Sequence, residues 1–132
     1  DERRAALVGT ISFGQADLMI ATEAIQHLRN MHLISKGSEV VLNNRAVRLV
    51  GSEYPEIDDI VGKLKEVTDK IYALDASELS MERFGTYRWT NPILLGVALA
   101  HTGLPIKRKT AEELLASEEE KAALALGLEY RF

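Results

Sequence analysis

Cysteine is absent from this 132-residue chain, which excludes disulfide scaffolds, thiol nucleophiles and thiolate zinc sites together. Long apolar runs are absent too, and none approaches the roughly 18–20 residues that span a bilayer. Low-complexity stretches and linkers are also missing, and only three prolines occur. What remains is a chain with 46% hydrophobic and 27% charged residues, the balance of a soluble protein that buries a core.

The start of the chain has Asp1 instead of methionine, and we expect it to be a trimmed part of a longer chain. Two arginines precede a short apolar stretch, but the small-residue pattern of a signal-peptide cleavage site is missing. We therefore expect a cytoplasmic location and no contact with a membrane. The length suits one domain, and we predict that residues 1–132 form a single domain.

Charge is distributed unevenly along the sequence, although the net charge is only −4. Residues 53–82 carry nine acidic and three basic side chains, whereas residues 83–109 carry five basic side chains and no acidic one. Segregation of this kind concerns partners and association, and it carries no information about the fold.

Helical patterns dominate the sequence. Apolar residues at three- and four-residue spacing predict helices over residues 15–34 and 55–74. The spacing of Asp75 and Glu78 predicts a helix start, and Gly85 a helix end. Asn91 and Pro92 predict the start of a buried helix that ends near Gly103. Capping boxes at Thr110–Glu113 and Ser117–Glu120 predict one or two more helices.

One segment has the pattern of strands. Residues 39–50 predict a β-hairpin in which Asn43 and Asn44 form a two-residue turn. The expected fold is therefore mainly α, a single compact helical domain of five or six helices with one β-hairpin (residues 39–50). The predicted core consists of Leu18, Ile25, Leu28, Ile60, Leu64, Val67, Ile71, Leu94, Leu95 and Leu99.

Catalytic motifs are weak. Glu23 and His27 have the spacing of two metal ligands on a helix, but the second histidine of an HExxH motif is missing. Gly9 and Gly14 resemble the glycines of a phosphate loop without its lysine. Paired carboxylates lie in predicted first helical turns, where they interact favourably with the helix dipole. We therefore predict no catalytic residues, no metal, no cofactor and no enzyme activity.

Arginines and aromatic residues alternate around residues 83–89, in a segment without acidic residues. Aromatic rings can stack on unpaired bases while guanidinium groups contact phosphates. A basic triplet before Thr110 and two arginines of the predicted hairpin extend this pattern. The predicted nucleic-acid-binding residues are Arg83, Tyr87, Arg88, Trp89, Lys107, Arg108, Lys109, Arg45 and Arg48.

The favoured function is therefore a non-catalytic binding subunit of a larger nucleoprotein assembly. Its predicted partners are single-stranded nucleic acid or a nucleoprotein complex, and other protein subunits. The small helical subunits of CRISPR interference complexes are an analogy in size and helicity alone. Alternatives are a protein–protein adaptor or regulator, including a homodimer, and a winged-helix DNA-binding regulator. A small enzyme would need a pocket that the sequence does not reveal.

Overall fold

A parallel β-sheet lies at the centre of the computed structural model, which describes residues 11–45 and 55–132. Within these residues the sheet has three strands, and their order in the sheet is their order along the chain. Val40 of the middle strand lies opposite Met19 on one side and Ile71 on the other. The strands are β1 (Leu18–Ala21), β2 (Glu39–Asn43) and β3 (Ile71–Leu74).

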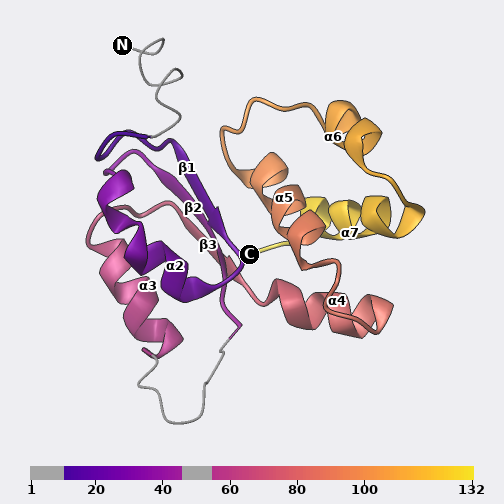
Figure 1. Ribbon diagram of the computed structural model, residues 1–132, viewed down its shortest axis with the longest axis horizontal. Helices are drawn as coiled ribbons and strands as arrows, with labels where there is room; N and C mark the ends of the chain where they lie inside the picture. Colours follow the sequence, from indigo (N-terminus) through magenta and orange to yellow (C-terminus); the bar gives the residue numbers. More distant parts are fainter. Residues whose placement is uncertain (1–10, 46–54) are drawn as a thin grey trace.

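Helices cover both faces of this sheet, which gives three layers (Figure 1). One face is covered by α2 (Ala24–Arg29) and α3 (Ile57–Lys65), with the short 3-10 helix η1 (Met31–Leu33) after α2. The other face is covered by α4 (Ala76–Phe84), α5 (Thr90–His101) and α7 (Glu118–Glu129). The short helix α6 (Arg108–Leu114) lies apart from the sheet, between α5 and α7 in the chain.

The middle strand β2 contributes to both apolar cores. Val41 packs with Leu74 and the apolar face of α5, whereas Val40 and Leu42 pack with Ile60 and Leu64 of α3. Successive side chains of a strand point to opposite faces of the sheet. A strand that is covered on both faces is therefore apolar at successive positions and does not alternate polar with apolar residues. Each fully buried valine or leucine contributes about 1.5–3 kcal/mol to folding.

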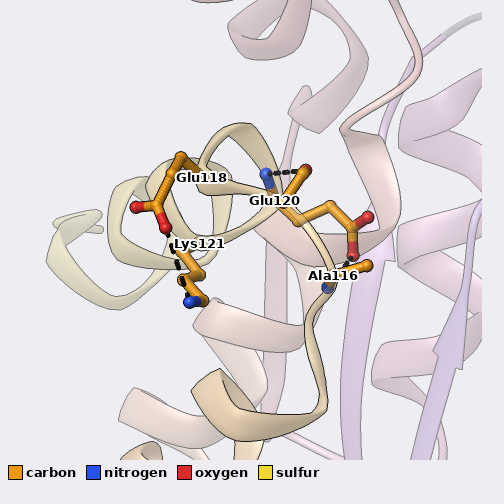
Figure 2. Close-up of polar contacts among 5 residues, drawn as sticks. Ala116, Glu118, Glu120 and Lys121 are labelled. Carbon is orange, nitrogen blue, oxygen red and sulfur yellow. Dashed lines mark hydrogen bonds and ion pairs between the residues drawn. The ribbon is translucent and has the colours of Figure 1, made fainter.

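The N-terminus of α7 shows how local sequence fixes a helix end (Figure 2). The Ser117 hydroxyl oxygen accepts a hydrogen bond from the backbone N–H of Glu120 at 3.1 Å. The Glu120 carboxylate in turn accepts a hydrogen bond from the backbone N–H of Ala116 at 3.4 Å. The Lys121 Nζ atom forms an ion pair with the Glu118 carboxylate at 3.6 Å. This arrangement confirms the predicted cap at Ser117, because the hydroxyl accepts a hydrogen bond from an N–H group that has no acceptor within the helix.

The predicted helical class is wrong, because a parallel α/β sheet organises the chain. Residues 15–34 do not form one helix: they contain β1, α2 and η1. Residues 55–74 contain α3 and then β3. In both segments an apolar run of four residues lies beside a short helix, and periodicity cannot separate two such elements when each is this short.

The predicted hairpin over residues 39–50 is also wrong. Residues 39–43 form the central strand, which pairs in parallel with both neighbours, and residues 46–50 lie outside the described part of the chain. Asn43 is not a turn residue, because it ends β2 with its side chain buried and hydrogen-bonded. Its amide group satisfies backbone groups of neighbouring segments, a role that sequence spacing does not reveal.

The other helix boundaries agree in part with the predictions. Asp75 caps α4 by accepting from the N–H of Glu78, and Gly85 ends that helix with φ of 70°. α5 begins at Thr90, one residue before the predicted cap at Asn91. Thr110 lies inside α6 and is not its cap. Of the predicted core, Ile60, Leu64 and Leu94 are fully buried, while Leu18, Leu28, Val67 and Ile71 pack at its edge.

Across residues 11–45 and 55–132, the helices are too short or too polar to cross a bilayer.

Candidate ligand-binding crevice

A polar crevice of about 320 Å³ opens where the strands end. It lies between the segment after β1, the end of β2, and the starts of α4 and α5. Parallel α/β proteins characteristically bind ligands beyond the carboxyl ends of their strands, so this position marks a candidate site. We call it the strand-end crevice, and its lining residues are Thr22, Glu23, Asn43, Arg45, Ser77, Tyr87, Arg88, Thr90 and Asn91.

The Asn43 side chain forms hydrogen bonds at the floor of this crevice. Its side-chain N–H groups donate to the Thr22 carbonyl at 2.9 Å and to the Ser77 hydroxyl at 3.0 Å. Its side-chain carbonyl accepts from the backbone N–H of Ala76 at 3.0 Å. One buried amide therefore joins the segments that follow β1, β2 and β3.

Ser77 and Thr90 continue the floor towards α5. Their hydroxyl oxygens lie 3.3 Å apart, and both side chains are buried. The Thr90 hydroxyl also donates to the Tyr87 carbonyl at 2.8 Å. This chain of hydrogen bonds holds the α4–α5 connection against the end of the sheet.

Among the described residues, the rim of the crevice carries two cations and one anion. The Arg45 guanidinium carbon lies 3.9 Å from the centre of the Tyr87 ring, in a cation–π contact. Arg88 is exposed on the same rim, where Glu23 supplies the carboxylate. No described carboxylate lies within 4.0 Å of either guanidinium, so the rim has an excess of positive charge.

Trp89 contributes to the core and is not a free stacking surface. Its ring is partly buried against the cluster that contains Ile93 and Leu94. Its backbone N–H donates to the Ser80 hydroxyl at 3.2 Å, and Ser80 donates to the Thr86 carbonyl at 2.5 Å. Trp89 thereby anchors the start of α5 to α4.

The structure brings together only part of the predicted binding residues. Arg45, Tyr87 and Arg88 meet at the strand-end crevice. Arg83 is exposed on α4 and is not part of the lining. Arg48 lies outside the described residues.

The basic triplet Lys107–Lys109 lies at the opposite end of the sheet from the crevice (Figure 1). Gly103, in the loop that leads to it, donates its N–H to Glu39, the first residue of β2. Within the triplet, Arg108 forms an ion pair with Glu112 at 2.7 Å. The predicted basic surface is therefore divided between the two ends of the molecule.

Six lining residues were missed by the sequence analysis, and all but one of them are uncharged. The signal that could have found them is a repeated pattern of a short apolar run followed by polar residues. It occurs after Ala21, after Leu42 and after Leu74. In a parallel sheet the carboxyl ends of the strands share one edge. The missed residues are Thr22, Glu23, Asn43, Ser77, Thr90 and Asn91.

The buried histidine His27 does not line this crevice. His27 is fully buried in α2, and neither of its ring nitrogens has a hydrogen-bond partner of ordinary geometry. Burial lowers the pKa of His27 to about 4, against a smaller opposite effect of the Val41 backbone. Across residues 11–45 and 55–132, no group of three or more histidine and carboxylate side chains is arranged to hold a metal ion.

The fold and the crevice define a class: an α/β protein with a parallel sheet and a ligand-sized crevice at the carboxyl ends of its strands. Within that class the chain belongs to the pyruvate ferredoxin/flavodoxin oxidoreductase family, whose sequence profile matches residues 4–129.

Three archaeal proteins illustrate the relationship, each an indolepyruvate oxidoreductase subunit IorB. The chain is similar to that of Archaeoglobus fulgidus, with 31% identity over 120 residues, 87% of this chain and 59% of the relative. For Methanothermobacter thermautotrophicus the identity is 31% over 109 residues, 79% of this chain and 54% of the relative. For Thermococcus kodakarensis the identity is 29% over 108 residues, which are 77% of this chain and 53% of the relative. The chain thus spans little more than half the length of these relatives.

These relationships correct the predicted function. A nucleic-acid-binding subunit with nucleic-acid partners is wrong, because the family and the relatives are oxidoreductases or their subunits. The prediction of no enzyme activity is wrong for the same reason. The winged-helix alternative is wrong as well, since the strand of the supposed wing is the centre of a parallel sheet. The adaptor alternative gives way to the match with an oxidoreductase family.

Proposed function

We propose that this chain is part of an oxidoreductase subunit that acts on indolepyruvate, in an assembly with at least one further subunit. The observation that carries the proposal is the 31% identity to indolepyruvate oxidoreductase subunit IorB across 87% of this chain. The match of residues 4–129 to the ferredoxin/flavodoxin oxidoreductase family supports a ferredoxin or flavodoxin as the electron acceptor.

The geometry supports a ligand-binding part for this chain within that assembly. The strand-end crevice has a hydrogen-bonded floor and a cationic rim, and indolepyruvate is a carboxylate. Both cores share β2, which supports the proposal of a single domain. A cytoplasmic location, where a soluble electron acceptor is at hand, belongs to the same proposal.

Co-purification and turnover test the proposal together. The protein is expressed with the other polypeptides of the assembly, and indolepyruvate-dependent reduction of methyl viologen is followed. We expect a stable complex whose activity is lost when this chain is omitted and is higher with indolepyruvate than with pyruvate. A complex that is equally active without the chain would contradict the proposal, and so would failure of the chain to join any complex.

A further inference from the structure

The strand-end crevice has the chemistry of an anion site, and this bears on which ligand the proposed oxidoreductase subunit binds. Its volume of about 320 Å³ is roughly ten times the share of one water molecule in the liquid. The crevice can therefore hold a small organic anion or a phosphoryl group with its attached atoms.

The charges at the rim favour an anion over a cation. Among the lining residues that the structure describes, Arg45 and Arg88 stand against one carboxylate, that of Glu23. The ion pairs seen among the described residues lie elsewhere, at Arg108–Glu112 and Glu118–Lys121. Guanidinium groups without a nearby carboxylate keep their N–H donors available, and their planar fork matches the oxygens of a carboxylate or phosphoryl group.

Arg45 is also held in place before any ligand binds. Its guanidinium group lies over the Tyr87 ring at 3.9 Å, and the Tyr87 carbonyl is fixed by the Thr90 hydroxyl. A stacked guanidinium presents its N–H groups in the plane of the fork, away from the ring that it covers. Because Arg45 is already ordered, less conformational entropy is lost on binding.

The floor of the crevice adds neutral polar groups that do not compete for the cations. Asn43 is 2% exposed, and its amide is hydrogen-bonded to both neighbouring segments. Ser77 and Thr90 are bonded to one another and to the same network. A rigid polar floor beneath two cations is a built feature of the fold, unlike scattered surface arginines.

We propose that the strand-end crevice binds the oxyanion group of a small molecule, a carboxylate or a phosphoryl group, through Arg45 and Arg88. The two sources share one recognition chemistry: the carboxylate of a 2-oxo acid such as the proposed substrate, or the phosphoryl group of another small molecule. The inference rests on the proposed function only for this choice of ligands, since the crevice exists in the chain itself.

Titration calorimetry of the full chain at low ionic strength tests the proposal with two probes, sodium pyruvate and sodium pyrophosphate. Saturable binding of pyruvate identifies a carboxylate site, and binding of pyrophosphate identifies a phosphoryl site. Binding of either probe supports the proposal. Failure of both probes to bind at millimolar concentration overturns it.

Matched variants locate the binding. Arg45→Met and Arg88→Met should each weaken binding about tenfold or more, as expected for the loss of a charge-assisted hydrogen bond. Arg83→Met removes the same charge from an exposed position of α4 outside the lining and should change the affinity less than about twofold. An equal loss in all three variants would show a diffuse charge effect and overturn the proposal.

Two further measurements separate the role of the guanidinium geometry from that of charge and from loss of the fold. Arg45→Lys retains the charge but loses the planar fork, so its affinity should fall between those of the native chain and Arg45→Met. Circular dichroism melting of each variant checks that the fold is intact. The calorimetry uses this chain alone, so an assembly inactive on indolepyruvate would refute the proposed function and leave the anion site standing.

Discussion

Gly96 of α5 lies directly against Gly127 of α7, and the backbones of the two helices touch at this point. A Cβ atom placed on Gly96 would lie 2.9 Å from the Cα atom of Gly127 and closer still to the Leu124 carbonyl oxygen. The two glycines set the separation of α5 and α7, because any side chain would push the helices apart. The N-terminus of α5 also forms one wall of the crevice.

Substitution at this contact gives the first prediction. Gly96→Ala and Gly127→Ala should each lower the free energy of unfolding by about 1–3 kcal/mol, the cost of overpacking a tight contact. Gly62→Ala in α3 is the control, because a Cβ atom there meets nothing within 4 Å. Alanine favours a helix over glycine by about 0.8–1 kcal/mol, so this control should be stabilised. Urea unfolding measures all three, and a stabilised Gly96→Ala would refute the close contact.

Asn43 provides a second prediction about the floor of the crevice. Asn43→Ala removes two donors and one acceptor from a buried network, which leaves the Ala76 N–H without its partner. Leaving a buried polar group unpaired costs about 1–3 kcal/mol, so we expect at least that loss in the free energy of unfolding. Asn44→Ala is the neighbouring control, because Asn44 donates to Leu74 through its backbone only. Equal stability of the two variants would contradict the bridging role of Asn43.

The buried imidazole of His27 predicts a pH dependence. Its pKa in the folded chain is about 4, below the ordinary value of 6.5, because burial disfavours the charged form. Between these values the unfolded chain binds a proton that the folded chain does not. The free energy of unfolding should therefore fall as the pH drops from about 6.5 to about 4, by roughly 3 kcal/mol at the acid end.

A variant separates this effect from other titrating groups. In His27→Leu the fall between neutral and acid pH should be smaller than in the native chain, as measured by urea unfolding at pH 7.5, 5.5 and 4.5. His32→Leu is the control, because His32 is exposed and its ring packs edge-on against Phe13. Identical pH profiles for the native chain and His27→Leu would exclude His27 as the source.

The last prediction compares Ser117 and Thr110, each of which begins a predicted capping box in the sequence. Ser117→Ala removes the hydroxyl that caps α7 and should cost about 1 kcal/mol. Thr110→Ala lies within α6, where no cap depends on it, and should leave the stability within about 0.5 kcal/mol of the native value. Thermal melting monitored at 222 nm measures both. A larger loss for Thr110→Ala would mean that α6 begins later than the structure shows.

The sequence by itself determined the features that depend on neighbouring residues. Asp75 caps α4, Gly85 ends it, and Ser117 caps α7, each as predicted. These interactions join groups within a few positions of one another, so they form in almost any tertiary setting. The apolar character of α5 likewise predicted its burial.

Only the tertiary structure decided the sheet and the crevice. Leu18–Ala21 and Ile71–Leu74 are strands because each pairs directly with residues 39–43, and no local pattern encodes that pairing. The crevice likewise unites Arg45 with Tyr87, which follows it by more than forty positions. Contacts over such distances arise when helices bury both faces of one sheet, and that packing sets where the polar strand ends meet.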